Sequence, residues 1–123
     1  MKNIMDLNVY TEALDFSNEI WTFCKQFDYF AQQTVGIQLV KSADSISANI
    51  AEGFGRYHYK ENLNFCYFAR GSVEEIKDWL RKAFHRKLIP HDYSTKTNED
   101  ITIIAKKLNN YINSIKARAS LKG

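Results

Sequence analysis

The chain has 123 residues, of which 45% are hydrophobic and 14% aromatic. A chain of this length fits one domain, residues 1–123, that buries about two-thirds of its surface, and the apolar content excludes an intrinsically disordered protein. The net charge is only +3, but it is divided unevenly, because residues 1–62 carry −3 and residues 63–123 carry +6.

The first predicted helix covers about residues 7–27. Its apolar residues recur at intervals of three and four, which is the period of an α-helix. The stripe consists of Tyr10, Ala13, Ser17, Ile20, Cys24 and Phe27. The polar and aromatic run Asp28-Tyr29-Phe30 separates this helix from the next one.

The second predicted helix covers about residues 33–53, and Gly53 suits the left-handed position that ends many helices. Only Lys41, Asp44 and Glu52 are charged in this segment. A surface helix of a monomeric bundle normally carries a charged outer face, so a helix without one is covered by something else. We therefore predict a homo-oligomer whose subunit contact contains Ile37, Val40, Ala48 and Ala51.

The third and fourth predicted helices cover about residues 59–88 and 95–119. Pro90 cannot continue the third helix, and Ser94 or Thr95 can cap the fourth. No segment alternates between apolar and polar residues with the period of a strand. Because the connections are short, neighbouring helices must run antiparallel, and the sequence predicts an all-α, up-down-up-down four-helix bundle.

A group of polar residues on the second and third predicted helices has two interpretations. Asn49, Glu52, Arg70 and Ser72 either form a binding site or form a hydrogen-bonded polar lock that fixes the register of the two helices. The lock is the interpretation that we favour. Within it, Glu52 pairs either with Arg56 four residues later or with Arg70 across the bundle.

The turn after the second predicted helix combines glycine, aromatic and cationic residues. Such side chains stack nucleic-acid bases and hold phosphates, although the aromatics of a turn also simply cover the end of a bundle. Antiparallel topology places the C-terminus of the chain at the same end, where cations also favour helix C-termini for purely local reasons. The candidate RNA- or DNA-binding residues are Arg56, Tyr57, His58, Lys60, Lys116, Arg118 and Lys122.

Two motifs resemble the family of four-helix-bundle proteins encoded in intervening sequences of bacterial 23S ribosomal RNA genes. They are Asn49-Ile50-Ala51-Glu52-Gly53 followed by Gly55-Arg56, and Ala69-Arg70-Gly71-Ser72 with Glu75. The resemblance implies a homopentamer of four-helix bundles. A related branch, the accessory variability proteins of diversity-generating retroelements, is similar and binds nucleic acid. The family usually has Ser or Thr before its third helix, where this chain has His58.

The sequence does not predict an enzyme. The three histidines are scattered without metal-ligand spacing, and no serine lies in a nucleophile motif. Cys24 and Cys66 lie on apolar stripes, as buried reduced thiols of a cytoplasmic protein do. We expect no cofactor, no metal, and neither a signal peptide nor a membrane span. The alternative to a nucleic-acid-binding oligomer is a structural or protein-interaction ring without affinity for nucleic acid.

Overall fold

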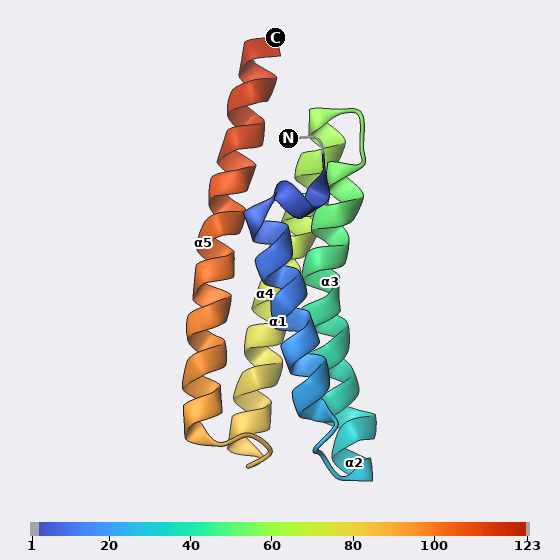
Figure 1. The fold of residues 1–123 in the computed structure, drawn as a ribbon, viewed down its shortest axis with the longest axis vertical. Helices are drawn as coiled ribbons and strands as arrows, with labels where there is room; N and C mark the ends of the chain where they lie inside the picture. The colour runs from blue at the N-terminus through green and yellow to red at the C-terminus, as the bar shows by residue number, and fades with distance from the viewer. Residues whose placement is uncertain (1–2, 123) are drawn as a thin grey trace.

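The computed structural model describes residues 3–122, and side chains through Leu121. The chain is 87% helical, and the described residues include no strand. Four long helices, shown in Figure 1, are α1 (Asn8–Cys24), α3 (Ile37–Phe54), α4 (Tyr59–His85) and α5 (His91–Lys122). A short turn of 3₁₀-helix, η1 (Ile4–Asp6), precedes α1, while α2 (Tyr29–Ala31) and the π-helical turn η2 (Gln32–Gly36) lead into α3 without a break.

The four long helices form an antiparallel bundle in which consecutive helices are neighbours. The pairs α1–α3, α3–α4, α4–α5 and α1–α5 are in contact, so α3 and α5 lie diagonally opposite each other. The ends of α1 and α4 therefore lie at one end of the bundle, and the end of α3 and the C-terminal turns of α5 lie at the other (Figure 1). The predicted all-α, up-down-up-down bundle is confirmed.

The predicted apolar stripes form the core, with Tyr10 and Phe27 of the first helix half-buried at its edge. Each fully buried aliphatic side chain contributes about 1.5–3 kcal/mol to folding relative to an exposed one. The largest of these side chains include Ile20, Leu39, Ile46, Ile50, Ile76, Leu80, Leu108 and Ile115. No helix within residues 3–122 is both long and apolar enough to cross a membrane.

Two helix starts differ from the prediction. The second helix begins four residues earlier than expected, because the Asp28 carboxylate accepts a hydrogen bond from the Ala31 amide at 2.9 Å and caps it. The fourth helix begins at His91, directly after Pro90, rather than at about residue 95. Ser94 and Thr95 therefore lie inside α5, where the Thr95 hydroxyl donates to the His91 carbonyl, and their predicted capping role is wrong.

The turn between α4 and α5 has a defined geometry that ends α4 at His85 instead of residue 88. Lys87 adopts a positive φ of 61°, and the Leu88 amide donates to the Ala83 carbonyl at 2.9 Å. This six-to-one hydrogen bond after a left-handed residue is the Schellman motif. It fixes the path of the chain into Pro90.

Gly53 does not end α3 in the left-handed conformation that the sequence predicted. The residue lies inside α3, and the residue that ends the helix, Gly55, has a right-handed φ of −78°. Gly53 instead allows close packing, since a Cβ atom there would lie 2.7 Å from Asn62 Oδ1 and 2.9 Å from Phe65 Cβ. The glycine therefore sets how closely α3 approaches α4.

Candidate nucleic-acid interface and subunit surface

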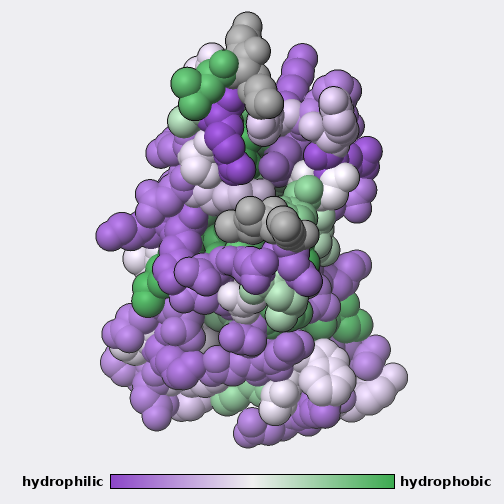
Figure 2. Space-filling view, turned by 45° about the horizontal axis from the view of Figure 1, so that its top comes forward, coloured by the Kyte–Doolittle hydropathy of each residue, from purple (hydrophilic) through white to green (hydrophobic). Residues whose placement is uncertain are grey.

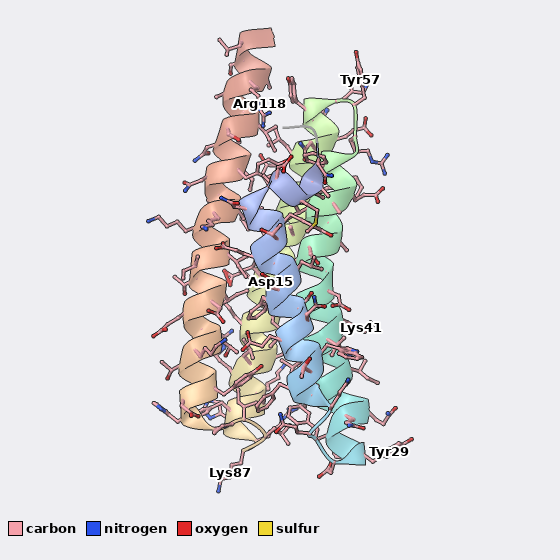
Figure 3. The ribbon with its side chains drawn as sticks, in the orientation of Figure 1. Asp15, Tyr29, Lys41, Tyr57, Lys87 and Arg118 are labelled. Atoms are coloured by element: carbon pink, nitrogen blue, oxygen red, sulfur yellow. The ribbon has the colours of Figure 1, made fainter. Side chains whose placement is uncertain are left out.

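The turn between α3 and α4 and the last turns of α5 share one end of the bundle, as topology predicted. Figure 3 shows Tyr57 and Arg118 at this end, and α5 extends beyond the turn in Figure 1. Figure 2 looks obliquely onto the same end, where hydrophilic residues cover most of the visible face. The candidate binding residues come from two segments that are far apart in the sequence, the turn that leads into α4 and the last turns of α5.

A cleft of about 310 Å³ lies between the α3–α4 turn and α5. Four of the seven candidate residues line it: Arg56, Tyr57, His58 and Arg118. The remaining wall is formed by Phe54, Tyr59, Asn62 and Tyr111. The structure therefore brings together the turn and α5 around one concave, cation-lined surface.

The two arginines of the cleft differ in how far their charge is already compensated. The Arg56 guanidinium lies 2.7 Å from the Glu52 carboxylate and 3.5 Å from that of Glu61, and it stacks 4.9 Å from the centre of the Phe65 ring. Among the described residues, no carboxylate lies within 4 Å of Arg118, whose Nε donates to the Ser114 carbonyl. Arg118 is thus better placed than Arg56 to attract an anion.

The sequence left open whether the aromatic residues of the turn stack nucleic-acid bases or cover the end of the bundle, and the structure shows some residues suited to each. Phe54 and Tyr59 are half-buried against the core and cover the end of the bundle. Tyr57 is 93% exposed, with its ring edge-on to His58 at 5.0 Å. His58 precedes α4 without a capping hydrogen bond from its side chain. The ring of Tyr57 is therefore available for stacking, with the exposed ring of His58 beside it.

The remaining candidate cations lie outside the cleft lining. Lys60 and Lys116 are exposed, on the first turn of α4 and near the end of α5. The side chain of Lys122 lies outside the described residues. The predicted set thus forms a cleft and a looser group of cations around it.

The predicted polar lock forms with a different membership. The Ser72 hydroxyl donates to Ser45 Oγ at 2.8 Å, and Asn49 Nδ2 donates to the same oxygen at 3.0 Å, so Ser45 connects the two predicted residues. Glu52 pairs with Arg56, which is the local alternative given by the sequence. Arg70 is exposed and lies over the Tyr67 ring at 4.9 Å.

The prediction that Arg70 belongs to the lock is therefore wrong, and of the two partners that the sequence offered Glu52, the structure has Arg56. The physical reason is helical phase. Ala69 is completely buried, so the next residue along α4 points about 100° away from the core. Ser45 was missed as a member, although its position four residues before Asn49 on the same helix face was the available signal.

The predicted subunit surface is partly exposed in the single chain. Ile37 is 40% exposed, Ala48 is exposed, and Val40 and Ala51 are half-buried. Ile37 and Val40 line a mainly apolar groove of about 280 Å³ between α1 and α3. Trp21, which sequence reasoning missed because it lies outside the predicted core stripe, forms the α1 wall and is 52% exposed.

A second groove, of about 270 Å³, lies between α1 and α5 and is lined by acidic residues of α1. Glu12 accepts a hydrogen bond from Lys107 at 2.7 Å, and Glu19 pairs with Lys96. The hydrogen bond to Glu19 raises the pKa of Lys96. These pairs connect the acidic first helix to the basic last helix.

Both cysteines are buried thiols, as predicted. Burial raises the pKa of Cys24 and of Cys66 to about 11, because a thiolate is poorly solvated in an apolar environment. Residues 3–121 contain no group of three or more His, Cys, Asp or Glu side chains placed to hold a metal ion.

Comparison with known proteins identifies relatives of this chain. Residues 5–110 match the family described as 23S rRNA-intervening sequence protein, so Lys116 and Arg118 lie beyond the matched region. A solved structure of unknown function from the S23 ribosomal protein family of Bacteroides thetaiotaomicron is 24% identical, with a TM-score of 0.77. The alignment covers 85% of this chain and 95% of that one, which shows a shared fold. The comparison with curated proteins gave no match.

Proposed function

The chain belongs to the 23S rRNA-intervening sequence protein family, and we propose that it is a non-enzymatic homo-oligomer that binds RNA or DNA at one end of its bundle. The observation that carries the proposal is the cleft in which Arg56, Tyr57, His58 and Arg118 converge. Cations hold phosphates without regard to sequence, and an exposed aromatic ring stacks on any base. The ligand class is therefore a nucleic acid bound without strong sequence preference.

The subunit contact proposed for this oligomer is the outer face of α3, on which Lys41 and Asp44 are the charged side chains between Ile37 and Ala48. Ile37 and Ala48 are exposed on that face, and the apolar groove beside it is bordered by Trp21. Resemblance to the family, including its retroelement-associated branch, favours a pentamer. A cyclic assembly repeats the cleft once per subunit and so multiplies its electrostatic field.

The proposed site of action is the cytoplasm, where a buried free thiol such as Cys24 or Cys66 stays reduced. The alternative function is a structural or protein-interaction ring. It is favoured by the pairing of Arg56 with two carboxylates, which reduces the charge available for phosphates.

Fluorescence anisotropy of labelled RNA and DNA at two salt concentrations tests the nucleic-acid proposal. If one subunit contacts three phosphates, the logarithm of the affinity should fall with that of the salt concentration with a slope of about −2 to −3. Arg118→Glu should weaken binding at least tenfold, whereas Lys106→Glu, the same charge change at an exposed position lower on α5, should have a much smaller effect. Absence of binding at low salt, with the oligomer intact, would leave the ring alternative.

Sedimentation of Ala48→Glu tests the subunit surface. Ala48 is exposed in the single chain, so a glutamate there leaves the bundle folded and disrupts only a contact that covers it. We expect a smaller species with unchanged helicity. Asn109→Glu, at an exposed position on α5, should sediment like the wild type. A wild type that sediments as a monomer at tens of micromolar would refute the oligomer.

A further inference from the structure

The end of the bundle opposite the cleft carries two exposed aromatic rings. Tyr29 and Phe30, at the start of α2, are each 77% exposed. The capping bond from Asp28 fixes the helical turn on which they lie. Figure 3 shows Tyr29 projecting away from the bundle. The two adjacent exposed rings form an apolar protrusion. Monomeric proteins rarely expose neighbouring apolar side chains in this way.

The same end of the bundle carries an apolar groove at the α4–α5 turn. The groove has a volume of about 570 Å³ and is lined by Phe84, Leu88, Ile89 and Pro90, together with His85 and Lys87. The Schellman motif and Pro90 give this turn a fixed shape. A preformed groove loses little conformational freedom when an aromatic side chain enters it.

The protrusion and the groove lie at matching heights on different edges of the molecule. Because the helices alternate in direction, the start of α2 and the α4–α5 turn are at one end of the bundle (Figure 1). The protrusion continues α3, whereas the groove leads into α5, which lies diagonally across the bundle from α3. Tyr29 and Lys87 accordingly point in different directions in Figure 3.

The charges beside the two features are complementary. The protrusion carries the carboxylate of Asp28, and the nearest cation before it in sequence, Lys25, lies over the Trp21 ring at 3.7 Å. Lys87 lines the groove, and its neighbour Arg86 is exposed. The nearest acidic residue in sequence beyond the groove is Asp92, whose carboxylate accepts a hydrogen bond from the Tyr93 amide at 2.8 Å. Opposite charges favour contact between the protrusion of one copy and the groove of another. Like charges disfavour contact of one protrusion with another, or of one groove with another.

We propose that Tyr29 and Phe30 of one copy insert into the α4–α5 groove of the next copy. The contact is heterologous, because it joins two different patches, and a heterologous contact repeated around an axis closes into a ring. The contact rests on the oligomer of the proposed function, and it specifies which patch of one subunit meets which patch of the next. Tyr29 and Phe30 precede Ile37 along the same continuous helical stretch, so the protrusion extends the proposed α3 contact to the end of the bundle.

Thiol crosslinking distinguishes this contact from other ways of assembling. The double variant Phe30→Cys, His85→Cys places one thiol on the protrusion and one at the groove, and a short bis-maleimide joins thiols that lie close together. The native cysteines interfere little, since both are buried and their pKa values are raised to about 11. We expect a ladder of covalent species that extends beyond the dimer.

Each single variant, Phe30→Cys or His85→Cys, is the matched control and should remain monomeric on a denaturing gel. A single variant that crosslinks to a dimer would mean that like patches meet, which would overturn the heterologous contact. Absence of a ladder from the double variant, when sedimentation still shows an oligomer, would also overturn it while leaving the proposed oligomer intact. A monomeric wild type would refute both.

A second measurement uses side-chain deletion. The double change Tyr29→Ala, Phe30→Ala should raise the concentration for half-assembly by more than about tenfold, as loss of an aromatic hot spot does. Leu121→Ala removes a side chain that is 88% exposed at the other end and should leave assembly unchanged. Equal assembly of the two variants would contradict the contact.

Discussion

Replacing Gly53 with alanine tests whether close packing of α3 against α4 explains this glycine. The added Cβ would lie 2.7 Å from Asn62 Oδ1, 2.9 Å from Phe65 Cβ and 3.0 Å from the Asn62 carbonyl oxygen. The amide of Asn62 can rotate away. The other two atoms are part of α4 or attached directly to it, so the two helices must move apart.

The expected cost follows from two opposing terms. Overpacking a well-packed contact costs about 1–3 kcal/mol, whereas alanine is favoured over glycine inside a helix by about 1 kcal/mol. Because the clash involves the backbone of α4, the first term should exceed the second, and Gly53→Ala should destabilise the protein by up to about 2 kcal/mol. In a chain of this length, 1 kcal/mol lowers Tm by about 3–6 °C.

Gly71 provides the matched control on the neighbouring helix. It is exposed within α4, and a Cβ atom there would meet nothing within 4 Å in the described structure. Gly71→Ala should therefore stabilise the protein by about 0.5–1 kcal/mol. Both variants are compared with the wild type by urea and thermal unfolding at one protein concentration, because assembly adds to apparent stability. A Gly53→Ala protein as stable as the wild type would refute the close-packing argument.

Three further outcomes follow from the contacts. Ser72→Ala should lower the free energy of unfolding by about 1 kcal/mol in urea, because it removes the hydrogen bond between α3 and α4. Lys107→Met should cost less than about 1 kcal/mol, with a smaller effect at high salt, since Glu12 and Lys107 are each 38% exposed. Burial raises the pKa values of Cys24 and Cys66 from 9.0 to about 11, so the stability that the neutral thiols contribute is complete below pH 9 and is lost as the pH rises towards 11. The urea midpoint should therefore be unchanged from about pH 8 to pH 9 and fall between about pH 9 and pH 11.

Apolar periodicity predicted the helices and their order correctly, but several helix ends differ. Periodicity depends on the side chains that fill the core, and those are the residues that packing fixes. A helix end depends instead on single hydrogen bonds, such as the cap from Asp28, and on backbone conformations, such as the positive φ of Lys87. A lysine in the left-handed conformation has no clear sequence signal, so the end of α4 could not be predicted.

The candidate cleft was predictable only at the level of topology. The antiparallel order of the helices places the backbones of Arg56 and Arg118 at the same end of the bundle, whatever conformations their side chains adopt. Which cation is compensated depends on side-chain reach, and the Glu61 carboxylate, on the first turn of α4, comes within 3.5 Å of the Arg56 guanidinium. For the same reason, the sequence offered Glu52 two partners, and only the structure selected Arg56.

The uneven charge of the chain is partly balanced inside the bundle. Glu12 and Glu19 of α1 pair with Lys107 and Lys96 of α5, so a share of the positive charge in the second half offsets the acidic first helix. Of the two arginines that line the cleft, Arg118 alone has no carboxylate partner among the described residues, and Lys60 and Lys116 lie outside the lining. Since charges more than about 8–10 Å apart are screened at physiological salt, one cleft offers only a modest attraction for phosphates. The proposed binding to nucleic acid therefore depends on repetition of the cleft around an oligomer, where several weak sites on one strand act together.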